Sequence, residues 1–223
     1  YQGKGCQTVV IPPIVSEYQE NKGRNAIKTI VYAGIPFRLG RRVKNTDEVK
    51  DRLDLAIRGI AEIIRRGGNV VFDIYGVTKE QYLTAYPVDK YILSGMDNNI
   101  RFHGKVAMKT VQKAINLADF TILLRNKNRA TMAGFPTKVV ESISCGTPVI
   151  TTRTSDLDEY LGSKEVFFID ISDEKEMIDD LEQAMGCNME LLQSMKRNCA
   201  INKQFCPETY ESVLYNFVKG VKK

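Results

Sequence analysis

Short apolar stretches alternate with amphipathic stretches along most of the chain. Six of the apolar stretches are rich in β-branched and aromatic residues and are bounded by turn residues or polar loops, a pattern that predicts strands. They cover residues 28–33, 69–75, 100–103, 120–124, 149–152 and 166–169. In VVFDIY and FTILL the apolar residues are nearly continuous rather than alternating. Continuous hydrophobicity is typical of strands that other elements cover on both faces.

Between the predicted strands, apolar residues recur at the spacing of amphipathic helices. The clearest case has apolar side chains at positions 49, 53, 57, 60 and 64. Thr46 is the expected N-cap of this helix, with acidic residues at 47 and 48 in its first turn, and the glycines at 67 and 68 are expected to end it. Residues 125–136 are predicted to form a loop. Further helices are predicted over residues 79–85, 108–118, 137–144 and 156–161, in two segments after residue 173 that break near Gly186, and in a last segment from Pro207.

This alternation predicts an α/β fold, a Rossmann-like doubly wound parallel sheet of about six strands with flanking helices. Residues 7–15 form an apolar run that Pro12 and Pro13 keep out of a helix, so an extended lead-in is expected there. Residues 16–25 are polar and loop-like. We therefore divide the chain into a lead-in at residues 1–25 and one domain at residues 26–223.

Composition agrees with a soluble globular protein and disfavours several classes. The 223 residues are 43% hydrophobic and 26% charged, and no apolar run approaches the length of a membrane span. The net charge of +5 is mild and spread out, which disfavours a nucleic-acid arm and is compatible with a small anionic ligand. Five cysteines without a CxxC pair indicate reduced thiols and a cytoplasmic setting. The single histidine, His103, disfavours zinc hydrolases and Ser-His-Asp triads.

The loop after the fourth predicted strand carries the most informative chemistry. In a doubly wound sheet the ligand lies at the carboxyl ends of the strands, and this loop holds basic residues at 125, 127 and 129 ahead of Gly134. A helix is expected to begin at Thr137, where free backbone amides and the helix dipole favour a phosphate group. Glu141, one turn later, can accept hydrogen bonds from the vicinal hydroxyls of a ribose. A basic surface loop with an exposed Glu141 fits the same residues.

The stretch GFPTKVVESISCGTPVITT, residues 134–152, resembles the donor-site signature of family-four (group 1) retaining glycosyltransferases of the GT-B fold. Glu141 matches the second glutamate of that signature, and residues 144–150 match its small-residue turn and strand. Residues 11–13 are similar to the interdomain stretch of the family. The resemblance covers nearly the whole chain, because four other segments match family patterns in the same order: YAG at 32–34, KDRLD at 50–54, FHGKV at 102–106 and ADF at 118–120.

The resemblance implies that the chain is the C-terminal, nucleotide-sugar-binding half of a two-domain enzyme whose absent N-terminal half binds the acceptor. Glu141 then holds the ribose of the nucleotide, and Gly34 lies in the glycine loop after the first strand. Gly104 and Val106 border the base. The sugar and the diphosphate face the main chain at the helix start, at Gly134, Phe135, Pro136 and Thr137.

Two residues depart from the family pattern. Ala133 stands where the first signature glutamate is expected, and Ile35 stands where an arginine commonly follows the glycine of the first loop. The diphosphate anchor is then Lys50 or the arginines at positions 38, 41 and 42, with Arg125 and Lys138 able to compensate. We expect Lys50, Arg125 and Lys138 to stabilise the departing diphosphate, without a metal ion or a separate cofactor.

The resemblance thus implies a retaining transfer of a hexose-type sugar from a UDP- or GDP-type donor to a glycan or lipid-linked acceptor, in surface polysaccharide synthesis. We expect the chain alone to be inactive, its location to be cytoplasmic with peripheral contact at the inner face of the membrane, and nucleic acid not to be a partner. Two alternatives stay open. A nucleotide-sugar 2-epimerase would need further carboxylates and a histidine at its site. A non-catalytic sugar-nucleotide or protein-interaction module is favoured by Ala133.

Two further features allow two interpretations each. His103 either adjoins the donor site or packs as an ordinary histidine. For the last predicted helix, the resemblance implies a crossing back onto the N-terminal domain, and ordinary packing on this domain is the alternative. The apolar face of that helix consists of Tyr210, Val213, Leu214 and Phe217.

Overall fold

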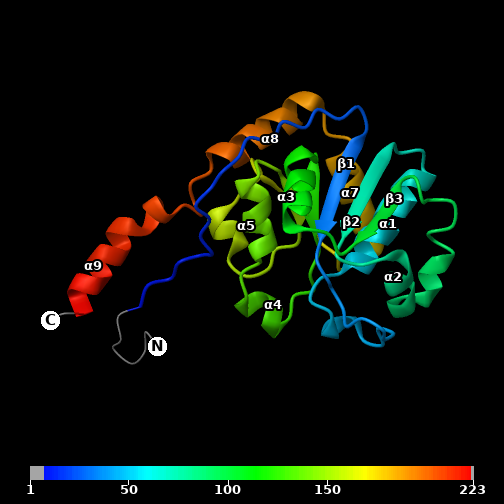
Figure 1. Ribbon diagram of the computed structural model, residues 1–223, viewed down its shortest axis with the longest axis horizontal. Coiled ribbons are helices and arrows are strands. Elements are labelled where there is room, and N and C mark those ends of the chain that lie inside the picture. Colours follow the sequence, from blue (N-terminus) through cyan, green and yellow to red (C-terminus); the bar gives the residue numbers. More distant parts are fainter. Residues whose placement is uncertain (1–7, 222–223) are drawn as a thin grey trace.

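The computed structural model describes residues 8–221, which contain one six-stranded sheet (Figure 1). The strand order is β3-β2-β1-β4-β5-β6, and every neighbouring pair is parallel. This order confirms the predicted doubly wound sheet, and each strand ends within one residue of its predicted bounds. The strands are β1 (Lys28–Ala33), β2 (Val70–Tyr75), β3 (Ile100–Gly104), β4 (Phe120–Leu123), β5 (Val149–Thr151) and β6 (Val166–Phe168).

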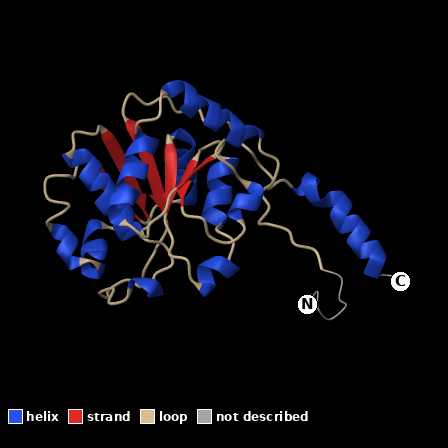
Figure 2. Ribbon diagram, turned by 180° about the vertical axis from the view of Figure 1, so that it is seen from behind, coloured by secondary structure: helices blue, strands red, loops and turns tan. Residues whose placement is uncertain are grey.

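Helices cover both faces of the sheet (Figure 2). On one face α1 packs against α7, while on the other α3 contacts β1 and α5 contacts β4 and β5 (Figure 1). Three short 3-10 helices are η2 (Thr46–Glu48), η3 (Pro87–Lys90) and η4 (Pro207–Tyr210). The α-helices are α1 (Leu53–Arg65), α2 (Lys79–Ala85), α3 (Met108–Leu117), α4 (Arg129–Ala133), α5 (Thr137–Ser144), α6 (Leu157–Tyr160), α7 (Glu174–Met185), α8 (Met189–Ile201) and α9 (Glu211–Val221).

The near-continuous apolar strands form the centre of the core. All four residues of β4 are buried, and Phe72 and Ile74 of β2 have no exposed surface. Against the sheet, α1 buries Leu53, Ile57 and Ile60, which lie on the predicted apolar face. Burial of each such side chain contributes about 1.5–3 kcal/mol. The loops at the carboxyl ends of the strands therefore stand on a rigid base.

One predicted helix start is wrong. Thr46 does not cap the first helix, because Asn45 caps the short helix η2 instead, its side chain accepting a hydrogen bond of 2.9 Å from the amide of Asp47. The backbone then becomes extended at Val49, and α1 begins only at Leu53. Lys50 and Asp51 therefore lie in the non-helical segment between η2 and α1.

The predicted loop over residues 125–136 is also wrong in part, because it contains α4. Asn128 caps this helix by accepting hydrogen bonds of 3.0 Å from the amides of Ala130 and Thr131. In return the hydroxyl of Thr131 accepts a hydrogen bond of 3.0 Å from the amide of Asn128. Such a capping box stabilises a helix that is too short to show an apolar period.

The described lead-in starts at the end of the molecule where α9 lies and runs along α8 to β1 (Figure 1). The described part of the lead-in has neither helix nor strand, and the amide of Gln19 donates a hydrogen bond of 2.7 Å to the carbonyl of Ser144 at the end of α5. Helix α9 projects away from the body (Figures 1 and 2), and Val213, Leu214 and Tyr215 are 39–60% exposed. Of the predicted apolar face, Val213 and Leu214 are therefore not packed on the domain, whereas Tyr210 and Phe217 are partly buried. None of the helices within residues 8–221 combines the length and the apolarity needed to cross a membrane.

Candidate functional site

In a doubly wound sheet, the observed strand order puts the expected ligand crevice between the ends of β1 and β4. These strands are neighbours, but the chain leaves β1 toward β2 and leaves β4 toward β5, in opposite directions. At such a switch point the loops separate and leave space for a ligand. Gly34 follows β1 directly, Arg125 lies two residues beyond β4, and α5 begins in the next stretch of chain.

The start of α5 presents free backbone amides at this crevice. Pro136 occupies the N-cap position, has no N–H group, and makes no side-chain capping bond. The first-turn amides of Thr137 and Lys138 have no partner within the helix, as in any helix start. Phe135 fixes the approach to the helix, because its ring packs edge-on against Tyr160 and Phe205 at 5.5 and 5.9 Å between centroids. The amides are therefore held in a fixed direction.

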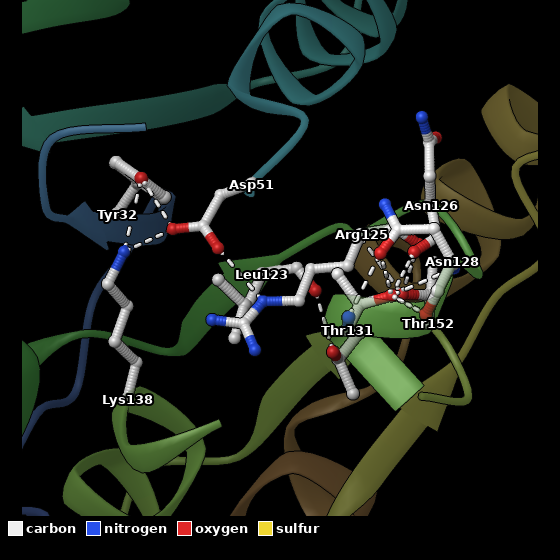
Figure 3. A network of polar contacts seen from close by, with 10 residues as sticks. Tyr32, Asp51, Leu123, Arg125, Asn126, Asn128, Thr131, Lys138 and Thr152 are labelled. Carbon is white, nitrogen blue, oxygen red and sulfur yellow. Dashed lines mark hydrogen bonds and ion pairs between the residues drawn. The ribbon is translucent and has the colours of Figure 1, made fainter. Parts of the chain in front are cut away.

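A buried carboxylate joins two of the predicted basic residues (Figure 3). Asp51 is 2% exposed and accepts a hydrogen bond of 2.9 Å from Nε of Arg125. Its other oxygen pairs with the ammonium of Lys138 and accepts a hydrogen bond of 2.9 Å from the hydroxyl of Tyr32. Burial opposes ionisation of Asp51, but the cations of Lys138 and Arg125 outweigh it and hold the pKa of this carboxyl below its ordinary value. Asp51 is therefore charged at neutral pH.

Lys138 extends from the first turn of α5 across the end of β1. Its ammonium lies 4.7 Å from the centroid of the Tyr32 ring and 3.2 Å from the Tyr32 hydroxyl. Gly34 leaves room for it: the residue has φ +151°, and a Cβ there would collide with the Lys138 side chain. Burial lowers the pKa of Lys138, and the positive charges of Arg125 and Lys50 lower it further, against the opposing effect of Asp51. The structure thus brings Arg125 and Lys138 together on Asp51, and Lys50 precedes Asp51 in the chain with an exposed side chain.

Arg125 retains an unused donor in this arrangement. Its side chain is 3% exposed, and its Nη1 is buried without a hydrogen-bond partner among the described residues. Its backbone is fixed, because the amide and carbonyl of Arg125 both bond the hydroxyl of Thr152 at 3.0 Å. A buried unpaired donor costs about 1–3 kcal/mol, more for a charged group. An anionic ligand oxygen would remove that cost.

Glu141 lines a groove of about 420 Å³ between α5 and α3, which the lead-in borders. Residues 137 and 141 lie one helical turn apart, so their side chains share one face of α5. Partial burial raises the pKa of Glu141, and Lys138 opposes this rise. Met108 and Val111 of α3 form an apolar wall of the same groove. The groove can hold a flat, partly apolar group beside a carboxylate.

The end of β3 lies at the same edge of the sheet, two strands from β1. The carbonyl of Gly104 accepts a hydrogen bond of 2.7 Å from Gly76, and Val106 precedes the α3 start that borders the groove. His103 faces elsewhere: its Nε2 lies 2.6 Å from Asp73 and its ring stacks on Tyr75 at 4.4 Å. These contacts favour the second interpretation, a histidine that packs beside Asp73 and Tyr75, with a side chain that is 34% exposed.

The remaining predicted residues lie in two places, beside the start of α5 and in a separate groove. Gly134 ends α4 and is exposed beside the α5 start, where Pro136 is buried. The arginines at positions 38, 41 and 42 line a separate groove, whose lining does not include Gly34, Lys138 or Glu141. These three arginines therefore do not contact the Asp51 cluster, and the choice between them and Lys50 as the diphosphate anchor stays a prediction. Asp51 was not predicted as a site residue. It follows Lys50 directly and precedes an apolar helical run, and a charged residue at this position comes close to the sheet.

A family model described as "Glycosyl transferases group 1" matches residues 39–186, which is more than half of the chain. No curated protein matches the sequence. Several solved structures share the fold at low identity. A TarM variant from S. aureus in complex with fondaparinux, α-GlcNAc-glycerol and UDP has 16% identity over 92% of this chain, with a TM-score of 0.65.

Two other solved structures are similar in the same way. The pneumococcal O-GlcNAc transferase GtfA in complex with UDP and GlcNAc has 17% identity over 94% of this chain and a TM-score of 0.60. HepE from Anabaena in complex with UDP has 15% identity over 87% of this chain and a TM-score of 0.61. The chain spans 38%, 40% and 50% of the lengths of these three structures, in the order given.

Proposed function

Because the chain belongs to the group 1 glycosyltransferases, we propose that it binds a nucleoside diphosphate sugar at the carboxyl edge of its sheet and forms the donor side of a glycosyl transfer site. One observation carries the proposal. The free amides at the start of α5, the ammonium of Lys138 and the unused Nη1 of Arg125 all lie at the switch point between β1 and β4.

The diphosphate is assigned to the crevice itself. Helix-start amides and the helix dipole favour an anion, and Thr137 and Lys138 supply these amides. Across from these amides, Gly34 has no side chain, and a Cβ there would collide with Lys138. The ammonium of Lys138 and the guanidinium of Arg125 then exchange part of their interaction with Asp51 for phosphate oxygens.

The nucleoside is assigned to the groove between α3 and α5. Glu141 accepts hydrogen bonds from the two ribose hydroxyls, for which a carboxylate with two oxygens is suited. The base then lies toward the start of α3, near Gly104 and Val106 and beside Met108. The groove volume of about 420 Å³ lies within the range of small-molecule sites.

The basic residues have a defined task in the reaction. When the bond between the sugar and the diphosphate breaks, the electron pair stays on the diphosphate, which gains negative charge. Fixed cations and amides that face this charge stabilise the transition state more than the ground state. We assign this role to Lys50, Lys138 and Arg125, with no step that passes through a separate cofactor.

Several finer points belong to the same proposal. The donor is of the UDP type and the sugar a hexose, which the UDP and GlcNAc in the TarM and GtfA structures support. Transfer proceeds with retention to a glycan or lipid-linked acceptor for surface polysaccharide. Residues 26–223 bind the donor, residues 1–25 lead into them, and the acceptor is bound by a part of the enzyme outside this domain. We place the reaction in the cytoplasm, at the inner face of the membrane.

Ala133 favours a second candidate function. It ends α4 beside Gly134, where the family pattern has a carboxylate that contacts the sugar. A domain with this change can bind the nucleotide and yet lack transfer activity, as a sugar-nucleotide binding module. The two candidates differ in product formation and agree in nucleotide binding.

Titration calorimetry with UDP, GDP and UDP-GlcNAc tests the proposal. We expect saturable binding of UDP, with an affinity at least tenfold lower in Lys138→Met, because each charge-assisted hydrogen bond contributes about 1.5–3 kcal/mol. Lys164→Met is the matched control, since Lys164 is exposed before β6 at the opposite edge of the sheet. Absence of binding by all three nucleotides contradicts the proposal.

A further inference from the structure

The loop between β1 and α1 carries positive charge that the crevice does not use. Arg38, Arg41, Arg42 and Lys44 are exposed and surround a groove of about 820 Å³. Glu48 is the one carboxylate that lines it. We call this surface the basic groove. Its four cations and single carboxylate give it a surplus of three positive charges.

The basic groove stands on an anchored loop. Phe37 is 7% exposed, and its ring packs on Tyr82 and Tyr86 of the α2 region at 6.3 and 5.8 Å. The amide of Val43 donates a hydrogen bond of 3.0 Å to the carbonyl of Ala85. Val49 is 5% exposed and closes the far end of the loop. The backbone is therefore held from both ends while the cationic side chains point to solvent.

The four cations have no protein partner within residues 8–221. None of them takes part in an ion pair or a side-chain hydrogen bond, whereas Arg52 pairs with Asp54 and Arg58 pairs with Asp89 close by. Unpaired like charges on one short loop repel one another. An anion that binds between them relieves this repulsion, and arginine favours phosphate because its planar group forms two parallel hydrogen bonds.

The donor does not need this charge, a step that rests on the proposed function. At the crevice, Lys138 and Arg125 pair with Asp51, and the exposed Lys50 is the chain neighbour of Asp51, so these four side chains together carry a charge of +2. This matches the two negative charges on the diphosphate of a nucleotide sugar. The basic groove lies between Gly34 and Lys50 in the sequence, so its loop begins and ends at the crevice.

We infer that the basic groove binds a phosphate group of the second substrate, whose reacting hydroxyl is held by the part of the enzyme outside this domain. The acceptor is then a phosphate ester or diphosphate. Such a phosphate comes either from the headgroup of a lipid acceptor in a bilayer or from a phosphorylated acceptor in solution. The chemistry is the same in both cases. The loop that leads from Gly34 to Lys50 would hold the acceptor phosphate next to the donor crevice.

The test measures binding of inorganic pyrophosphate by calorimetry at low salt, with UDP present at saturation so that the crevice is filled. We expect one pyrophosphate site, weakened at least tenfold by the double change Arg41→Gln and Arg42→Gln, while UDP affinity stays within twofold. The matched control, Lys164→Gln with Lys175→Gln, removes the same charge from exposed positions elsewhere. Unchanged pyrophosphate binding in the arginine variant overturns the inference.

Other outcomes separate this inference from the proposed function. If UDP affinity falls by the same factor in the arginine variant, the loop serves the donor, and the inference fails while the proposed function stands. If UDP does not bind but pyrophosphate binding depends on the two arginines, the proposed function fails and the basic groove is still an anion site. Co-sedimentation with phosphatidylcholine vesicles containing phosphatidylglycerol identifies the source. Binding that the arginine variant loses assigns the phosphate to lipid, and pyrophosphate binding without vesicle binding assigns it to a soluble acceptor.

Discussion

Replacement of Asp51 by asparagine tests the buried cluster at the end of β1. The change keeps the size of the side chain and removes its charge, so Arg125, which is 3% exposed, loses its counter-charge. Removal of one partner of a buried ion pair costs about 3–5 kcal/mol. The asparagine oxygen can still accept one hydrogen bond, so we expect about 3 kcal/mol. For a chain of this size that corresponds to a fall in Tm of about 6–12 °C.

The assay is urea unfolding of the wild type and of Asp51→Asn, followed by circular dichroism. Asp179→Asn is the control, because Asp179 is 56% exposed and its pair with Arg66 lies on the surface. That control should not change the midpoint measurably. A loss of stability in Asp51→Asn no larger than in the control would show that the Asp51 cluster does not stabilise the fold.

The pH dependence of the same two proteins gives a second readout. The folded-state pKa of Asp51 lies below its ordinary value of 3.8, so its charge contributes stability above that pH. The contribution is lost as pH falls through the lowered folded value. We expect the stability difference between wild type and Asp51→Asn to be full above about pH 5 and to shrink below the ordinary pKa of the carboxyl. A difference that grows on acidification contradicts this assignment.

Three further substitutions test the space at Gly34, the ribose contact of Glu141 and the cap of α4. Gly34→Ala places a Cβ against Lys138 at a positive φ. We expect the free energy of unfolding to fall by about 1–3 kcal/mol in urea titrations, and UDP affinity to fall at least tenfold by calorimetry. Unchanged UDP affinity would mean that the space at Gly34 does not matter for binding. Glu141→Gln should weaken UDP about tenfold but leave 2′,3′-dideoxy-UDP unaffected, and equal losses for both ligands would argue against a ribose contact. Asn128→Ala removes the cap of α4 and should cost about 1 kcal/mol by thermal unfolding, with no change expected if α4 does not form.

Local patterns were sufficient to predict most elements of the fold. The helices over residues 79–85 and 137–144 have their predicted bounds, because a capping threonine at 78 and a proline at 136 mark their starts. The prediction of Thr46 as the N-cap of the first helix was wrong because its neighbour Asn45 is an equally good cap and forms a tighter local turn. Helix α4 spans too few residues to show a period, although Asn128 and Thr131 at capping-box spacing were a usable signal.

The site was predictable only where the residues lie close in the sequence. Gly134, Thr137 and Glu141 form one local corner, which a motif can reveal. Asp51 meets Arg125 and Lys138 across 74 and 87 positions, and no local pattern shows that contact. The burial of a carboxylate is likewise a tertiary property. In the same way, the sequence pattern of an apolar helix face is the same whether the face is packed or exposed, as Val213 and Leu214 of α9 are.

Amide chemical shifts during a UDP titration of ¹⁵N-labelled protein report where the diphosphate lies on the domain. We expect the largest changes at the amides of Gly34, Thr137 and Lys138, with smaller changes near Glu141. Saturable UDP binding that leaves those amides unchanged, with its largest shifts in the loop at residues 38–44 or on α7, would contradict this expectation.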